Sequence, residues 1–340
     1  MAGWDSWRVL SIVVAGWFVP SGFDEPGLKP YHLAGYAQGT TYAITYYANE
    51  QSVSKGTIDS ILASIDSSMS LYKPYSLINK INESDGRIRV ADAHFQRVLR
   101  RSFEIYRRSG GLFDITVAPL VQLWGFGVEA VDHLPDSAAV NEVLARVGMD
   151  KIRRRGRLLI KRKPGVALDM NGIAQGYSVD VLADHLESKG IARYLVELGG
   201  ELRVKGPKPD GTPFRVGIER PVPSDGNATV VNDVVEIQRG AITTAGSYRK
   251  FLQEGDRRVS HHINPKTGYP FATGIISATV YSDEAMTADG YDNVIMAMPV
   301  AEAITFANRF KGMEVFIIYQ DKEGSIRDTM SLGFKKLIAN

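Results

Sequence analysis

Apolar side chains recur every three or four residues in several stretches of the chain, which is the spacing of one face of an α-helix. The clearest stretch covers residues 55–69 and ends before the turn at Lys73-Pro74. A second covers residues 91–109 and is stopped by Gly110-Gly111, since glycine readily adopts the left-handed conformation that ends helices. The same spacing predicts further helices over 173–189, 286–298 and 301–310.

Other stretches alternate apolar and polar residues or hold short apolar runs, and these predict β-strands. They cover residues 34–47, 194–198, 214–218, 234–237 and 275–281. Strands and helices are mixed without a regular βαβ order. We therefore expect an α+β fold with mixed or antiparallel sheets and packed helices.

Residues 151–163 are crowded with basic side chains (KIRRRGRLLIKRK). Such a run occurs in nucleic-acid-binding patches, and also in a solvated hairpin whose polar side chains point outward. The whole chain holds 40 Lys and Arg residues against 38 Asp and Glu, a net charge of +2, which is too balanced to imply nucleic acid or an anionic membrane as a partner. We therefore predict two short strands around Arg155-Gly156.

The composition is that of a soluble globular protein with a substantial core, since 44% of the residues are hydrophobic and 23% are charged. Cysteine is absent. This excludes disulfides, cysteine nucleophiles and thiolate metal sites, so any metal must be held by oxygen or nitrogen ligands.

The N-terminal region has the composition of a signal peptide. Residues 9–19 form an apolar run that is short for a membrane span, and Val14-Ala15-Gly16 is similar to the start of a lipoprotein box. Trp17 stands where the lipidated cysteine would be, so no lipid can attach there. We expect residues 1–31 to be a leader and linker, residues 32–340 to be the functional domain, and the protein to act in the bacterial cell envelope, peripheral to the membrane at most. The alternative is a buried N-terminal segment.

Three polar residues near the start of a predicted helix form a candidate metal site. Asp289, Asp292 and Asn293 are spaced so that they project from one helical face. Two carboxylates and an amide oxygen suit Mg²⁺ or Ca²⁺. The alternative is that acidic residues in a first helical turn merely complement the helix dipole.

Three further motifs carry weaker signals. The stretch from Gly125 to Ala130 imitates a dinucleotide fingerprint but lacks the strand and helix of a βαβ unit. Two adjacent histidines, His261 and His262, would point to opposite faces of an extended chain, which argues against a joint metal site and leaves one toward a cleft and one outward. The junction from Asp169 to Gly176 joins a strand to a helix, and its exposed amides suit a phosphate or simply reverse the chain.

Taken together, these motifs resemble the ApbE family of FAD:protein FMN transferases. The resemblance runs from about Gly35 to Leu337 and rests on six segments in the family's order. They are residues 37–42, 69–76, 110–127, 168–180, 244–268 and 286–289. The resemblance implies the ApbE-like, T-fold-like architecture.

The resemblance also implies a site. Residues that match FAD contacts in the family are Gln38, Tyr72, Leu112, Phe113, Asp114, Asp169, Gln175 and Ile263. Residues that match the metal ligands are Gly172, through its carbonyl, with Asp289, Asp292 and Asn293. His261 matches the family's histidine and is a candidate general base; a metal-bound carboxylate is equally plausible.

Three of these positions depart from the family pattern. Gln38 stands for methionine, Asn293 for threonine, and Gln175 for a lysine near the phosphates, and the last change removes a cation that would stabilise the transition state.

The implied reaction is the Mg²⁺-dependent transfer of FMN from FAD to a Ser or Thr hydroxyl of a client protein, with AMP leaving. The alternatives are a FAD pyrophosphatase that uses water as acceptor, and a non-catalytic flavin-binding protein. The implied partners are FAD and a client with an FMN-binding type of domain, and no nucleic acid.

Overall fold

The computed structural model describes residues 27–131, 133–221, 229–247, 251–254 and 257–339. The predicted leader, including Trp17, therefore lies outside the described residues, as does Tyr248 of the matched segment 244–268. The first strand already begins at Lys29, so the folded domain includes three residues that the sequence assigned to the linker.

The centre of the fold is an eight-stranded sheet in which all neighbouring strands are antiparallel. Its order is β1-β2-β6-β7-β10-β13-β14-β15. The bounds are β1 Lys29–Ala37, β2 Thr40–Ala48, β6 Tyr194–Leu198, β7 Glu201–Lys205, β10 Arg239–Gly246, β13 Ile275–Ser282, β14 Glu314–Gln320 and β15 Ile326–Met330.

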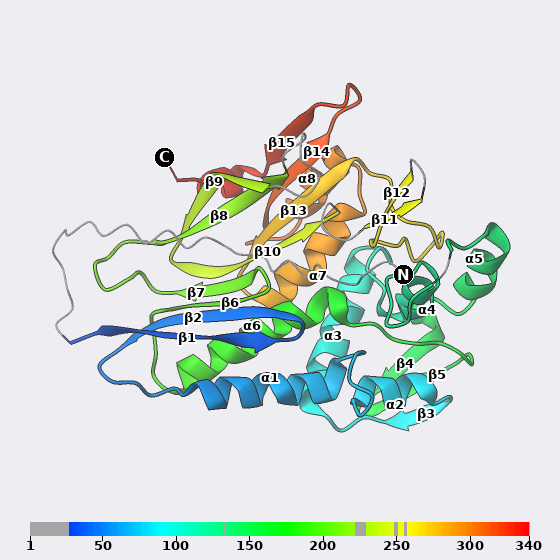
Figure 1. Cartoon of the computed structure of the whole chain (residues 1–340), viewed down its shortest axis with the longest axis horizontal. Helices are drawn as coiled ribbons and strands as arrows, with labels where there is room; N and C mark the ends of the chain where they lie inside the picture. Colours follow the sequence, from blue (N-terminus) through cyan, green and yellow to red (C-terminus); the bar gives the residue numbers. More distant parts are fainter. Residues whose placement is uncertain (1–26, 132, 222–228, 248–250, 255–256, 340) are drawn as a thin grey trace.

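Helices cover one face of this sheet and a hairpin covers the other (Figure 1). On the first face lie α1 (Lys55–Met69), α6 (Asn171–Ser188) and α7 (Ala285–Met296), with α8 (Val300–Ala307) beside β14. On the second face, β8 (Phe214–Pro221) and β9 (Thr229–Ile237) enclose a separate apolar cluster together with α9 (Leu332–Lys335). The central helices α6 and α7 therefore lie between the sheet and the elements formed by residues 77–161.

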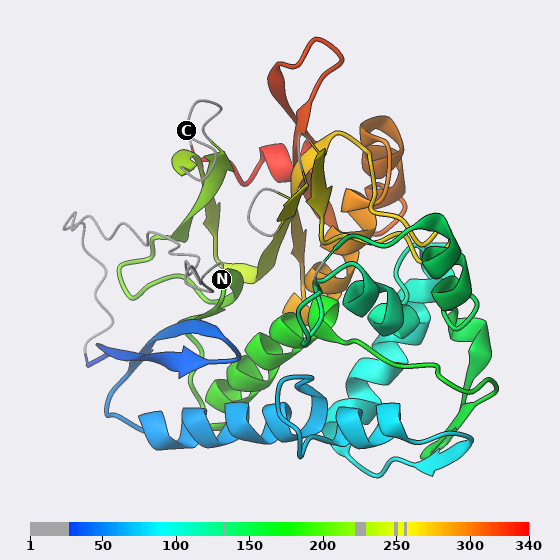
Figure 2. The ribbon, with the colours of Figure 1, turned by 45° about the vertical axis from the view of Figure 1, so that its right-hand side comes forward.

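A second group of elements packs against α7 and α6 from outside the sheet, as the turned view shows (Figure 2). It contains α2 (Leu77–Glu83), α3 (Ala93–Arg108), α4 (Ala118–Leu123), α5 (Ser137–Leu144) and the short 3-10 helices η1 (Ile115–Val117) and η2 (Met149–Lys151). Its strands β3 (Arg87–Arg89), β4 (Ile152–Arg155) and β5 (Leu158–Lys161) form a sheet of their own, and β11 (Phe251–Glu254) pairs with β12 (Arg257–Ser260).

The α+β fold with antiparallel sheets is confirmed, and several elements lie where the pattern predicts them. The helix predicted over 55–69 is α1 with the same bounds, and the predicted hairpin around Arg155-Gly156 is β4 and β5. One side chain of that hairpin does not point outward: Lys161 is buried, and its ammonium donates to the carbonyls of Asn82 and Ser84.

The strand predicted over 34–47 is wrong, because this stretch is a hairpin of β1 and β2. Gln38 and Gly39 form the two-residue turn, with φ of 52° and 76°. Two positive φ angles belong to a type I′ turn, which normally carries Asn-Gly. Glutamine in this conformation is uncommon, so the residue types at this point do not indicate a turn.

In the described part of the chain, no helix is long and apolar enough to cross a membrane.

Candidate functional site

The candidate metal cluster is assembled where α6 and α7 come closest. Gly176 makes this approach possible, because a Cβ at this position would lie 2.4 Å from the carbonyl oxygen of Ala285. The N–H of Gly176 donates to Oδ2 of Asp289 over 2.8 Å. One turn earlier, Gly172 departs from helical geometry, with ψ of 19°, and its carbonyl accepts from Nδ2 of Asn293 over 3.3 Å. The first turn of α6 is thus joined to the polar face of α7.

The acidic residues of α7 are buried and lie beyond the first helical turn. Asp289 is 5% exposed and Asp292 is 1% exposed. Solvated acids that merely complement a helix dipole would lie exposed in the first turn, so the structure contradicts that alternative. Burial raises the pKa of Asp289 to about 7, and burial together with the charge of Asp289 raises the pKa of Asp292 well above its ordinary value. A cation beside them would relieve this repulsion.

The donor set fits a hard cation. Nδ2 of Asn293 donates to the carbonyl of Gly172, the carbonyl of Asp289 (2.9 Å) and Oδ1 of Asp292 (2.9 Å), so three oxygens surround one polar atom. The reversed orientation of this amide would offer Oδ1 of Asn293 as a ligand. In the described part of the chain, no group of three or more His, Cys, Asp or Glu residues is arranged to hold a metal. The cluster has only two carboxylates, and the remaining ligands would be amide and carbonyl oxygens, as Mg²⁺ accepts.

Two residues that the sequence did not single out hold the cluster in place. Thr243 of β10 is buried and donates its hydroxyl hydrogen to Oδ2 of Asp292 over 2.7 Å. Asp180 of α6 is fully buried, and its carboxylate accepts from the N–H groups of Ala285 and Met286 at the start of α7. Thr243 directly precedes the matched segment 244–268, and Asp180 ends another, but neither position carries a local signal of this role.

The predicted flavin-side residues lie around the first half of α6. In the β1–β2 turn, Nε2 of Gln38 donates to Oγ of Ser178 over 2.9 Å. Tyr72 follows α1 and is 49% exposed. Partial burial, and to a lesser extent the charge of Asp169, raise the pKa of its phenol. Gln175 lies beside the β6–β7 turn, since a Cβ on Gly199 would be 2.9 Å from its Nε2.

The segment that contains Leu112, Phe113 and Asp114 turns at Gly110 and Gly111, which have φ of 63° and 84°. The carboxylate of Asp114 is buried and already accepts from the N–H of Thr116, the hydroxyl of Thr116 and the N–H of Met149. These bonds tie the segment to η2. The backbone N–H of Asp169 donates to the carbonyl of Ile115 over 2.7 Å. This bond holds the segment of Leu112, Phe113 and Asp114 next to the start of α6.

The remaining predicted residues lie after β12. Ile263 is buried and forms a bridge with Pro270, and the ring of His261 faces the edge of Phe126. The two histidine rings do not point to opposite faces, because their centroids are 4.0 Å apart. That prediction assumed an extended chain, but β12 ends at Ser260. Burial, with a smaller contribution from His261, holds the pKa of His262 well below its usual value, so this imidazole is neutral.

A cavity of about 300 Å³ connects two of these segments. Gly110, Gly111 and Asp114 line one side, and Pro265 and Lys266 line another. It does not include the carboxylates of α7. The cavity is lined by one buried carboxylate, Asp114, whereas the α6–α7 cluster brings together two, Asp289 and Asp292.

Comparison with known proteins gives one consistent answer. The sequence profile of the ApbE family matches residues 38–317. The FAD:protein FMN transferase of Vibrio cholerae is 32% identical over 334 residues, covering 96% of this chain and 98% of the relative, and that of Haemophilus influenzae is 33% identical over 322 residues, covering 91% and 92%.

Solved structures agree. The flavin transferase ApbE from Vibrio cholerae superposes with a TM-score of 0.82 at 33% identity, covering 91% of this chain and 99% of the other. The flavinyl transferase ApbE of Pseudomonas stutzeri, in its apo form, gives a TM-score of 0.82 at 28% identity, covering 94% and 99%. With this profile match, these identities and the α6–α7 cluster in place, the chain belongs to the ApbE family.

Proposed function

We propose that this protein transfers the FMN part of FAD to a Ser or Thr hydroxyl of a client protein and releases AMP. The observation that carries the proposal is the junction of α6 and α7, where the carbonyl oxygens of Gly172 and Asp289 and Oδ1 of Asp292 surround the side-chain amide of Asn293. The relatives named above as FAD:protein FMN transferases support the same reaction.

Mg²⁺ is the cation that this donor set would hold, and when bound it would neutralise the pyrophosphate of FAD. The residues of the chain then position the substrates. The hydroxyl oxygen forms a bond to the FMN-side phosphorus, the pyrophosphate P–O bond breaks, and AMP leaves with the bridging oxygen. The hydroxyl proton passes to His261 or to a carboxylate of α7 as general base.

Gln175 occupies the place of the family's usual lysine and adds no charge near the phosphates. Since both water and a client hydroxyl would benefit from that cation, its loss slows both reactions together. The choice between transfer and hydrolysis therefore depends on whether the client hydroxyl or water reaches the phosphorus. We expect Tyr72 to favour the client hydroxyl, because its ring is half exposed and can stack on a flavin.

Replacing Tyr72 by asparagine should raise the share of free FMN severalfold relative to protein-bound FMN, because a small polar side chain admits water where the ring excludes it. The measurement mixes the protein with FAD, Mg²⁺ and a client domain, and follows covalent flavin and free FMN together. Tyr75→Asn is the matched control, since Tyr75 is 59% exposed in the same loop. Equal ratios of free to protein-bound FMN in the two variants would show that Tyr72 does not exclude water from the phosphorus. Release of FMN by the wild-type protein without labelling of the client would favour the alternative activity, a FAD pyrophosphatase.

A further inference from the structure

The small sheet of β3, β5 and β4 presents one face that is almost entirely arginine and aliphatic. Side chains alternate between the two faces of a strand, so the register decides which residues share a face. Arg87 and Arg153 flank Ile160 in one cross-strand row, and Arg89 and Arg155 flank Leu158 in the next. The four arginines are exposed, while Leu158 and Ile160 are partly buried between them. We call these six residues the arginine face.

The opposite face of the same sheet is the one that packs on the protein. It carries Ile152 and Leu159, which are buried, and Lys161, whose ammonium donates to two carbonyls. Arg154 also lies on this face and donates to Oε1 of Gln96. The arginine face is therefore not needed to hold the sheet in place.

Among the residues that the structure describes, the arginine face has no acidic partner. Within the described ranges, no ion pair and no side-chain hydrogen bond involves Arg87, Arg89, Arg153 or Arg155. By contrast, Arg203 forms ion pairs with three carboxylates. Asp85 precedes β3, and its carboxylate accepts a hydrogen bond from the N–H of Gly165 and not from these arginines.

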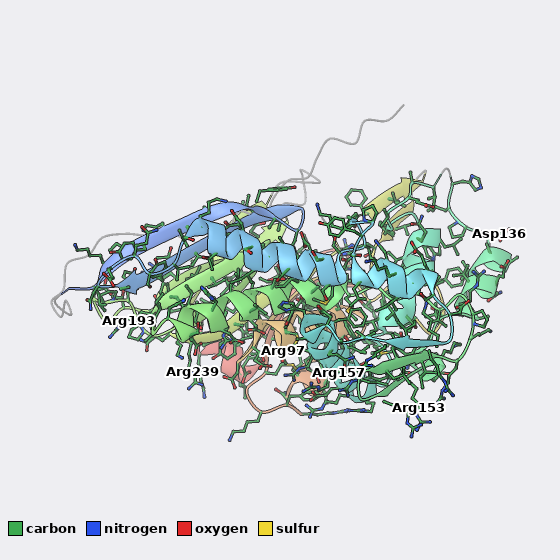
Figure 3. The ribbon with its side chains drawn as sticks, turned by 90° about the horizontal axis from the view of Figure 1, so that it is seen from below. Arg97, Asp136, Arg153, Arg157, Arg193 and Arg239 are labelled. Carbon is green, nitrogen blue, oxygen red and sulfur yellow. The ribbon has the colours of Figure 1, made fainter. Side chains whose placement is uncertain are left out.

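Four like charges this close repel one another, since neighbours along a strand are about 7 Å apart and the two outer strands about 10 Å apart. An anionic partner would relieve that repulsion. The overall charge of +2 does not reveal this face, because a net charge carries no information about where the charged side chains lie. Figure 3 shows Arg153 and Arg157 on the side of the molecule formed by β4 and β5, with Arg153 projecting beyond the ribbon.

The chemistry of the face favours a lipid surface over nucleic acid. Guanidinium groups bind phosphate in a bidentate manner, and the two aliphatic residues between them suit the boundary of headgroups and acyl chains. Single-stranded nucleic acid needs aromatic side chains for stacking, and the arginine face has none. Strands of three and four residues are also too short to form the ribbon or helix that enters a major groove. We propose that the arginine face docks the protein on an anionic lipid bilayer.

The test is cosedimentation with vesicles of phosphatidylglycerol and phosphatidylcholine, compared with vesicles of phosphatidylcholine alone. The wild-type protein should bind only the anionic vesicles, and binding should weaken as salt is raised. Each arginine near such a surface contributes about fivefold to binding, so replacing Arg87, Arg89, Arg153 and Arg155 together by glutamine should reduce it at least about 100-fold.

The matched control replaces four exposed cations on other surfaces by glutamine: Lys189, Arg239, Arg309 and Lys311. It changes the net charge by the same amount and should keep most of the binding. An equal loss of vesicle binding in both variants would mean that binding depends on the net charge of the protein and not on the arginine face, and it would overturn the proposal. Binding of duplex DNA that the arginine-face variant loses, without any vesicle binding, would overturn it in favour of nucleic acid.

A measurement on the unmodified protein keeps the proposal testable should the fourfold variant fold poorly. Arginine-specific labelling with phenylglyoxal, read by mass spectrometry, should show Arg87, Arg89, Arg153 and Arg155 protected by anionic vesicles and Arg239 unprotected. Equal labelling with and without vesicles would contradict docking through this face. None of these readouts depends on flavin transfer.

Discussion

Replacing Asp289 by asparagine is expected to lower the rate of FMN transfer about 1,000-fold, because a bound divalent cation supplies several kcal/mol of transition-state stabilisation. Asparagine keeps the shape and can still accept the hydrogen bond from the N–H of Gly176. It removes one of only two carboxylates in the cluster. The measurement is AMP release with FAD, Mg²⁺ and client, alongside calorimetric titration of Mg²⁺.

The fold should survive this change. Burial raises the pKa of Asp289 to about 7, so above that pH the metal-free protein must hold a buried charge that asparagine does not carry. At pH 8 without metal, the variant should therefore be at least as stable to heat as the wild type. Asp283→Asn is the control, because Asp283 is 75% exposed just before the same helix, and it should leave transfer unchanged. Normal transfer by Asp289→Asn would refute the metal site.

Replacing Asp180 by alanine is expected to lower the free energy of unfolding by about 3 kcal/mol, because buried donors would lose their acceptor. The start of α7 has no capping side chain of its own, and both oxygens of Asp180 accept from its first N–H groups, over 3.0 and 2.9 Å. Arg203 holds the carboxylate from the other side over 2.9 Å. Urea unfolding measures the loss.

Asp184→Ala is the matched control, since Asp184 contacts the same arginine but is 44% exposed, and exposed ion pairs contribute less than about 1 kcal/mol. Asp180→Ala should also weaken Mg²⁺ binding, because Asp180 fixes the helix that carries Asp289 and Asp292. Equal stability of the two variants would show that Asp180 does not anchor α7.

Regular elements could be predicted from the sequence where one periodicity dominates. The spacing of Ile58, Leu62 and Ile65 places these three residues on the buried face of α1, so its bounds follow from pattern alone. The β1–β2 hairpin could not be found in this way. Its turn depends on a positive φ at Gln38, and the hydrogen bond to Ser178 that accompanies it comes from a residue 140 positions away.

In the candidate site, too, only the residues that share one element could be predicted together from the sequence. Asp289, Asp292 and Asn293 share one helix, and their common face follows from local spacing. Their partners do not, because Gly172 and Asp180 of α6 and Thr243 of β10 meet α7 only through tertiary packing. Sequence reasoning also placed the two histidines on opposite faces, which is wrong because the chain leaves β12 before them.

The most direct test of the proposed transfer is the intact mass of a client FMN-binding domain produced together with this protein. We expect a client heavier by one FMN, attached through phosphate to a single Ser or Thr, with AMP as the other product. Production with Asp289→Asn should leave the client unmodified. A client of unchanged mass, accompanied by free FMN and AMP, would rule out transfer and identify water as the acceptor.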